Sequence, residues 1–303
     1  MTEPAPVAAP FARTPAGLPV GFRRARSAWQ LDLPRLLAFA RGERFAFFDF
    51  GPVDAVAVRA ARDAGLGVGT VDLLDWPALL SADAGRRRAA VVANASHVRS
   101  LAAAGVTRFL TVLAPDDPAG PRRDHFAYAV ESYRSLAAAA GECGASILIE
   151  GAPGRPPHFA NLGCTPADLR AFLAAVDSPA VGVNYDPSHL VRMGIDPVRF
   201  LREFADRVGH VHAKDTVFPE AERYEHGTLQ QATFAAPHAY GGHAWRYALP
   251  GRGVVPWRAV WDALADVGYV GGVSIELEDE EYLTDEAAER RGLVDARDYL
   301  ERG

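Results

Sequence analysis

The sequence predicts an α/β protein, a single-domain (β/α)8 TIM barrel, from three observations. Short apolar runs alternate with helical stretches almost to the C-terminus of the 303-residue chain. With a weak first strand the alternation gives eight β/α units, the number that closes a parallel barrel. Several of the runs end on an ionisable residue, as expected where the functional groups of a barrel gather. An open doubly wound sheet is the alternative, but the glycine-rich phosphate loop that it calls for is missing after the first strand.

The first half of the chain alternates aromatic or β-branched runs with alanine-rich segments. The run FAFFDF at 45–50 is typical of a buried strand, and the alanine-rich stretch after it is typical of a helix. Strands are expected at 21–25, 45–50, 67–73 and 109–114, and helices at 53–64, 84–104 and 125–141.

The second half has clearer boundaries. Thr165 before Pro166, and Asp196 before Pro197, each place a capping residue ahead of a proline at the first helical position. Strands are expected at 146–150, 180–185, 209–213 and 272–276, and helices at 166–176, 197–207, 256–267 and 285–300.

A long irregular segment interrupts the last part of the pattern, as a loop insertion at about 216–252. Its residues include His226, His238, His243, Tyr240 and Trp245. Such a segment serves either as a lid that excludes water from a site or as a contact in a homodimer. Its histidines are not counted as ligands, because loop histidines are mostly solvated.

Residues 1–18, rich in proline and alanine, are expected to form a flexible N-terminal tail, and residues 19–303 the barrel. The tail has no apolar run of signal-peptide length, and no stretch approaches the ~18–20 apolar residues of a membrane span. Cys143 and Cys164 have neither metal-type spacing nor the number needed for a disulfide framework. These features predict a cytoplasmic protein without a membrane partner.

The balance of charge points to a small-molecule substrate. The formal charge is −6, and the one short basic run is Arg86 to Arg88, so no nucleic-acid partner is expected. Of the 32 basic residues only Lys214 is a lysine. Where arginine replaces lysine so widely, the remaining lysine is expected at a position where a compact ammonium is needed.

Four of the last expected strands carry an ionisable side chain at or near their C-terminal end. These side chains are Glu150, Asp186, His212 and Glu276. Burying carboxylates is costly unless they are paired or bound to a metal, and a divalent cation would relieve their mutual repulsion. Three carboxylates and one imidazole suit Mn²⁺, Co²⁺, Mg²⁺ or Zn²⁺.

Three alternatives remain open at this site. Asp186 precedes Pro187 and could simply cap a helix. His210 shares a strand face with His212 and could replace it as the ligand. Lys214 lies on the same face, where it would bind a substrate oxygen or phosphate, unless it only forms a local ion pair with Asp215.

Four motifs in order resemble the sugar phosphate isomerase/epimerase superfamily, whose members are xylose isomerase-like TIM barrels. They are NYDPSHL at 184–190, HVHAKDT at 210–216, a Pro-Gly-x-Gly element at 250–253 followed by Trp257, and SIELED at 274–279. The resemblance runs from about residue 147 to the C-terminus. The second expected strand departs from it, because related barrels end that strand in Glu and this chain offers Asp49.

The resemblance implies roles for individual residues. Glu150, Asp186, His212 and Glu276 would hold one divalent metal ion, and the two glutamates would double as the catalytic acid/base pair. His189 would face the substrate or order a ligand, and Arg246, in the insertion, would be a substrate clamp.

The expected function is a divalent-metal-dependent sugar or sugar phosphate isomerase/epimerase, acting by proton transfer through a metal-stabilised enediolate. One alternative is a metal-dependent lyase or dehydratase that acts by β-elimination on a keto-inositol or a 3-keto-glycoside. An alternative of another class is a non-catalytic barrel that keeps its metal for sugar sensing.

Overall fold

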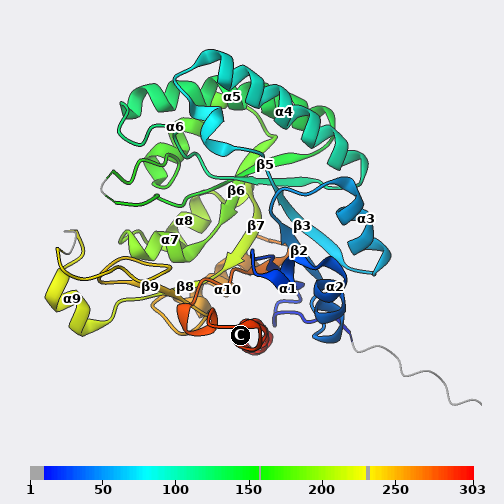
Figure 1. Ribbon diagram of the computed structural model, residues 1–303, viewed down its shortest axis with the longest axis vertical. Helices are drawn as coiled ribbons and strands as arrows, with labels where there is room; N and C mark the ends of the chain where they lie inside the picture. Colours follow the sequence, from blue (N-terminus) through cyan, green and yellow to red (C-terminus); the bar gives the residue numbers. More distant parts are fainter. Residues whose placement is uncertain (1–9, 157, 230–232) are drawn as a thin grey trace, which may run out of the picture.

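Eight parallel strands form a closed barrel in the computed structural model, which describes residues 10–303 apart from 157 and 230–232 (Figure 1). The barrel strands in chain order are β1 (Val20–Arg23), β2 (Phe47–Phe50), β3 (Gly67–Asp72), β4 (Arg108–Thr111), β5 (Ser146–Glu150), β6 (Val181–Tyr185), β7 (Val208–Ala213) and β10 (Val273–Ile275). Each pairs with the next along the chain, and β1 closes the ring against β10, with Val20 opposite Val273. The predicted (β/α)8 TIM barrel is confirmed.

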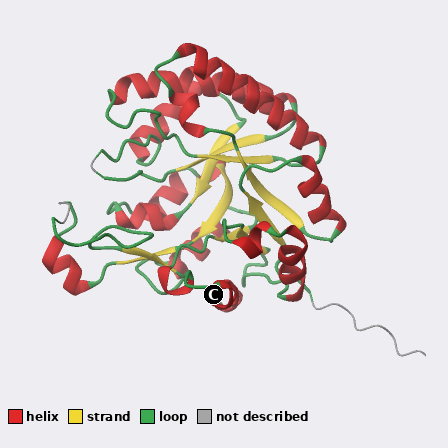
Figure 2. Ribbon diagram, viewed as in Figure 1, coloured by secondary structure: helices red, strands yellow, loops and turns green. Residues whose placement is uncertain are grey.

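Helices surround the strands (Figure 2). They are α1 (Ala28–Leu31), α2 (Leu33–Gly42), α3 (Ala55–Asp63), α4 (Ala84–Ala103), α5 (Arg122–Glu142), α6 (Pro166–Val176), α7 (Pro187–Arg192), α8 (Pro197–Glu203), α9 (Glu220–His226), α10 (Trp257–Asp266) and α11 (Glu286–Arg302), with short 3-10 helices η1 (Trp76–Leu80), η2 (Ala205–Arg207) and η3 (Glu280–Tyr282). Among the described residues, none of these helices has the length and apolar character needed to cross a membrane.

The predicted elements match the structure closely where capping residues mark them. Helix α6 and strand β5 have the predicted bounds, and Thr165 caps α6 by accepting a hydrogen bond from Asp168 N. Sequence reasoning did not anticipate α2, and it considered α7 only as the helix that Asp186 would cap.

The tail prediction needs correction for residues 10–18. Ala12 and Leu18 are buried, and the chain here is tied down by backbone hydrogen bonds from Ala12 N to Arg44 O and from Val20 N to Ala12 O. This segment therefore packs against the barrel next to β1. Residues 1–9 lie outside the described part of the chain.

An aromatic cluster fills the space between β1, β2 and α2. Phe22 makes edge-to-face contacts with Phe39, Phe45 and Phe48, at centroid distances of 6.1, 4.7 and 5.6 Å. Edge-to-face packing adds to the free energy gained from burying the rings. The cluster explains why the weak first strand has a stable place in the barrel.

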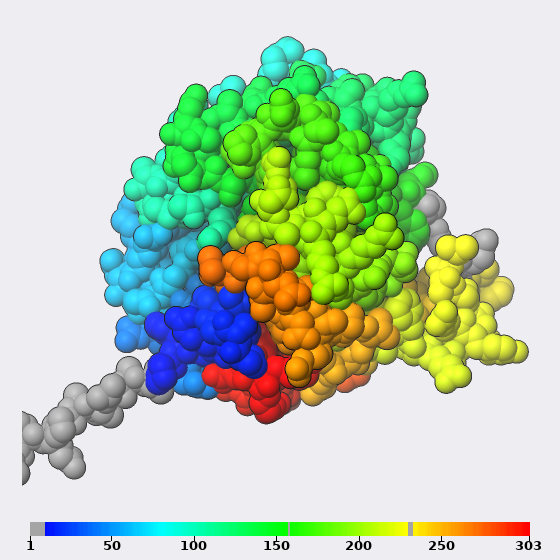
Figure 3. Space-filling view, turned by 180° about the vertical axis from the view of Figure 1, so that it is seen from behind, coloured from blue at the N-terminus to red at the C-terminus, as the bar shows by residue number. Residues whose placement is uncertain are grey.

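The insertion lies at one side of the barrel and has its own small sheet, β8 (Asp215–Val217) paired antiparallel with β9 (Arg246–Ala248). Figures 1 and 3 show the segment around α9 projecting from the body of the molecule. Its base is held by the carboxylate of Asp215, which is fully buried. That carboxylate accepts hydrogen bonds from Gly251 N, Val255 N and Trp257 Nε1. Asp215 is thus a structural anchor, and it does not pair with Lys214.

Replacing this anchor is expected to destabilise the fold. Asp215→Ala leaves the N–H groups of Gly251, Val255 and Trp257 without their acceptor, so the free energy of unfolding should fall by about 2–4 kcal/mol. Asp206→Ala is the control, because the Asp206 side chain is 80% exposed, and a change within about 0.5 kcal/mol is expected. Urea denaturation followed by circular dichroism measures both. Equal stability of the two variants would contradict the anchoring role.

Candidate metal centre and substrate cavity

Of the four predicted ligands, Glu150, Asp186 and Glu276 come together with His189 at the C-terminal end of the barrel, and His212 belongs to a neighbouring group with Asp49 and His210. Glu150 is the last residue of β5, Asp186 follows β6, His212 lies in β7, and Glu276 follows β10. His212 Nδ1 lies 2.7 Å from Glu150 Oε1 and 3.6 Å from Glu276 Oε2. The two glutamates therefore approach the imidazole from strands on either side of β7.

The two carboxylate oxygens of Asp186 make different contacts. Its Oδ1 caps α7 by accepting hydrogen bonds from Ser188 N at 2.9 Å and Ser188 Oγ at 2.6 Å. Its Oδ2 faces the other carboxylates and accepts no hydrogen bond from any described residue. The capping interpretation and the ligand interpretation of this residue are thus compatible.

Lys214 places the only ammonium of the chain among these carboxylates. Its Nζ lies 2.5 Å from Glu276 Oε2, 2.8 Å from Glu278 Oε2 and 3.3 Å from Asp186 Oδ2. It also lies 4.2 Å from the centre of the Tyr247 ring. A lysine is well suited to this position, because a compact ammonium can be shared by several oxygens.

The charged side chains in the cluster shift one another's pKa values. Burial alone would lower the pKa of Lys214, but Asp186, Glu276 and Glu278 around it hold that pKa well above its ordinary value. Burial would raise the pKa of Glu276, whereas Lys214 and His212 hold it well below the usual range. Burial would lower the pKa of His212, whereas Glu150 and Glu276 raise it well above the usual value.

The donor set fits a divalent cation. Among the described residues, the four carboxylates of Glu150, Asp186, Glu276 and Glu278 face two permanent cations, Lys214 and Arg23, and Arg23 is shared with Asp72. Asp186 Oδ2 and His212 Nδ1 are buried and lie in ionic contacts, Oδ2 at 3.3 Å from Lys214 Nζ and Nδ1 at 2.7 Å from Glu150 Oε1. The excess of negative charge around them is what a divalent metal ion would offset.

A second imidazole borders the same carboxylates. His189, on α7, offers a nitrogen that lies within 4.8 Å of ligand atoms of Glu150, Asp186 and Glu276. Its Nε2 is 3.5 Å from Asp186 Oδ2, and its Nδ1 is 2.6 Å from the Tyr247 hydroxyl. Burial and the nearby Lys214 hold the pKa of His189 well below its ordinary value, which favours the neutral ring.

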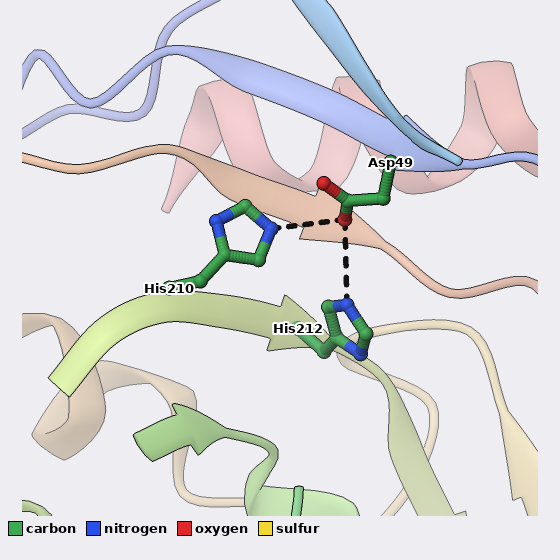
Figure 4. Close-up of side chains that lie close together, drawn as sticks. All are labelled: Asp49, His210 and His212. Atoms are coloured by element: carbon green, nitrogen blue, oxygen red, sulfur yellow. Dashed lines mark hydrogen bonds and ion pairs between the residues drawn. The ribbon is translucent and has the colours of Figure 1, made fainter. Parts of the chain in front are cut away.

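Asp49 lies beside His210 and His212 (Figure 4). It contacts Nε2 of His212, whereas Nδ1 of the same ring is the atom near Glu150 and Glu276. Its Oδ2 is 3.3 Å from His212 Nε2 and 2.9 Å from His210 Nε2. Burial would raise the pKa of Asp49, but the two histidines hold it well below the usual range. A carboxylate in this place fixes the ring of a metal-binding histidine, so that the other nitrogen faces the metal.

The position of Asp49 depends on a glycine in the neighbouring strand. A Cβ on Gly69 would lie 2.2 Å from Asp49 Oδ1, so only glycine allows this approach. The adjacent backbone N–H of Thr70 donates to the same oxygen at 2.7 Å.

Sequence reasoning missed an ion pair that completes the rim. Arg23 ends β1 and binds Asp72, at the end of β3, through two hydrogen bonds of 2.8 and 2.6 Å. The Nε of Arg23 is also 3.3 Å from Glu276 Oε1. The signal was present, because both residues are charged groups that close apolar strands.

A cavity of about 730 Å³ opens next to the carboxylate cluster, with His189 and Glu278 among its lining residues. The loop after β5, helix α7 and the insertion supply the remaining walls. On α7, Arg192 lines the cavity and donates to the Tyr247 hydroxyl at 2.6 Å.

Arg246 is placed differently from what a substrate clamp requires. It is not among the described residues that line the cavity, because its guanidinium binds Asp279 Oδ1 at 3.0 Å and also Glu281. Arg246 therefore holds the insertion against the acidic loop after β10, whereas Arg155 and Arg192 are arginines that line the cavity.

Comparison with known proteins agrees with this architecture. The model of the xylose isomerase-like TIM barrel family matches residues 37–302. The chain therefore belongs to the xylose isomerase-like TIM barrel family.

Individual relatives match shorter segments. The uncharacterized protein YfiH of Bacillus subtilis (strain 168) is 38% identical over 106 residues, covering 33% of this chain and 32% of that protein. Inosose dehydratase of Lacticaseibacillus casei is 28% identical over 116 residues, covering 38% and 37%. The matched segment spans about a third of the length of these curated relatives.

Among solved structures, 3-keto-D-glucoside 4-epimerase (YcjR) from E. coli aligns with 93% of this chain and 98% of its own, at a TM-score of 0.68. The sequence identity is 17%, so the likeness concerns the fold.

The geometry around Asp49 generates a prediction about metal affinity. Asp49→Asn is expected to weaken Mn²⁺ binding about 10–100-fold, because the His212 ring loses the carboxylate that orients it. His210→Gln is the matched control, since His210 contacts the same carboxylate but lies away from the glutamates. Calorimetric titration of both variants with Mn²⁺ measures the effect. If His210→Gln abolished binding while Asp49→Asn did not, His210 would be the ligand.

Proposed function

We propose that the protein is a divalent-metal-dependent isomerase or epimerase of a sugar or sugar phosphate. Glu150, Asp186, His212 and Glu276 hold the ion, which is Mn²⁺, Co²⁺, Mg²⁺ or Zn²⁺. The single observation that carries the proposal is the convergence of Glu150 and Glu276 on His212 Nδ1 beside a cavity. We choose His212 over His189 as the ligand because His212 is fully buried with Nδ1 turned to both glutamates, whereas His189 lines the cavity.

In this proposal Glu150 and Glu276 exchange a proton with the carbon next to a substrate carbonyl. They enter from strands β5 and β10 on opposite sides of β7, so one can remove a proton from one face while the other returns it elsewhere. When bound, the cation would polarise the carbonyl and stabilise the enediolate. Positioned acid–base groups of this kind contribute about 10²–10⁴-fold to the rate.

Other residues hold the substrate and the acid–base pair in place. Asn184 Nδ2 donates to Glu150 Oε1 at 2.8 Å, which fixes the carboxylate. His189 lies between the cluster and the cavity and is suited to bind a substrate hydroxyl. The Lys214 ammonium is suited to bind a developing oxyanion beside Glu276 and Glu278.

A lyase acting by β-elimination on a keto-inositol or 3-keto-glycoside is the second candidate. Two observations favour it: Lys214 can hydrogen-bond a departing hydroxyl, and inosose dehydratase is among the relatives. The same pair of glutamates would remove the proton, so the two reactions differ in what leaves the substrate.

Solvent deuterium separates these functions. The Mn²⁺-loaded protein is expected to incorporate deuterium from D₂O next to the carbonyl of a ketose, as measured by NMR. Glu276→Gln should lower this exchange by about 10²–10⁴-fold. Glu142→Gln, whose side chain is 64% exposed on α5, is the control and should exchange like the wild type.

Three outcomes would overturn the proposal. Water loss from a keto-inositol, without deuterium in any ketose, would make the protein a lyase. Bound metal with no exchange on any sugar would make it a non-catalytic sensing barrel. Exchange by Glu276→Gln at the wild-type rate, with its metal bound, would remove Glu276 from the acid–base pair.

A further inference from the structure

Helix α9 of the insertion keeps its place without a buried side chain. All of its residues, 220–226, are partly or fully exposed, with Tyr224 at 87%. Figure 1 shows the helix at the edge of the molecule, beyond the β8–β9 sheet. Because burial of apolar area is the main source of packing free energy, packing contributes little to the position of α9. Polar contacts therefore matter more here than in the helices around the barrel.

One such contact is a histidine shared by two carboxylates. His238 Nε2 lies 2.7 Å from Glu222 Oε2, on α9, and His238 Nδ1 lies 2.6 Å from Glu280 Oε1, on η3. The second oxygen of Glu280 accepts a hydrogen bond from Ala239 N at 3.0 Å. The bridge of Glu222, His238 and Glu280 thus joins α9 to the loop after β10.

This geometry requires a protonated ring. A neutral imidazole has one N–H donor, whereas an imidazolium has two. An ionised carboxylate can only accept, so both contacts of His238 are hydrogen bonds only when both ring nitrogens carry a proton. Loss of one proton leaves one carboxylate facing a nitrogen lone pair, and that hydrogen bond is lost.

The charges around His238 place its titration above the ordinary range. Burial would lower the pKa of His238, but Glu222 and Glu280 raise it above its ordinary value. Burial would raise the pKa of Glu280, whereas the hydrogen bonds that it accepts and the nearby Arg246 guanidinium, from β9, lower it. The bridge is therefore complete below about pH 6.5, the ordinary value for histidine, and is lost as the pH rises through the raised pKa of His238.

The bridge is part of the cavity wall. His238 and Ala239 line the cavity, and so does Gly227, directly after α9. Gly227 has a φ of 64°, a backbone conformation that glycine adopts without strain and that suits a bend in the chain. The base of the insertion is held separately by Asp215. A change at His238 therefore affects the wall near α9 and leaves the base in place.

We propose that His238 is a pH-sensitive latch of the insertion. Its imidazolium holds α9 against the loop after β10 and closes that side of the cavity, and release of a ring proton frees α9. The inference concerns the insertion and depends on neither the metal nor the substrate.

Hydrogen–deuterium exchange of the full chain, read by mass spectrometry on the α9 amides, tests the latch. Variants are compared with the wild type at the same pH, because the chemistry of exchange itself depends on pH. At about pH 6, His238→Gln is expected to raise the exchange rate of α9 about 3–10-fold, the value of two partly exposed ionic contacts. At about pH 9 the wild type should exchange like His238→Gln, since its ring is then neutral.

Two further variants accompany His238→Gln. Glu222→Gln removes the charged acceptor on α9, so it should also raise α9 exchange at the lower pH, and it serves if His238→Gln does not fold. Glu225→Gln is the matched control, because Glu225 is an exposed glutamate of the same helix, and it should exchange like the wild type at both pH values. The amides of α5 report whether each variant keeps its fold.

Two results would overturn the latch. Equal α9 exchange in the wild type and the two bridge variants at the lower pH would show that the bridge does not hold the helix. A difference that persists unchanged at the higher pH would show that His238 acts by packing and not by charge. A ring pKa of His238 below about 6.5, measured by NMR titration, would also contradict the proposal.

Discussion

The concentration of carboxylates at one end of the barrel is the constraint on which the site depends. Glu150, Asp186 and Glu276 are brought within a few ångströms of one another in surroundings that exclude most water. Such charges are costly to bury unless positive charge is placed among them. Lys214 and Arg23 supply part of it from the protein, and the proposed divalent cation would supply the rest.

Several residues outside this cluster are arranged to keep it in place. Asp49 contacts Nε2 of His212, and Nδ1 of the ring is then directed toward the glutamates. Ser188 holds one oxygen of Asp186 and leaves the other directed at the cluster. Asp215 fixes the base of the insertion, so that the same segment of chain supports the β7 residues and the wall of the cavity. The positions of the candidate ligands and the shape of the cavity therefore depend on residues that lie close together in the sequence.

The barrel and its charged rim could be predicted because strand alternation and strand ends are local features. Glu150 closes an apolar run, and in a closed parallel barrel every such end meets at one mouth. The roles of Arg192 and Arg246 could not be predicted, because they depend on how the insertion folds over α7. The packing of Ala12 and Leu18 was missed because a segment rich in proline and alanine has no periodic pattern.

Anomalous scattering from a crystal of the wild-type protein grown with Mn²⁺ tests the central claim most directly. One strong peak is expected about 2.0–2.2 Å from oxygens of Glu150, Asp186 and Glu276 and from His212 Nδ1. A peak bound instead by Asp49, His210 and His212, or no peak at the barrel mouth, would contradict it.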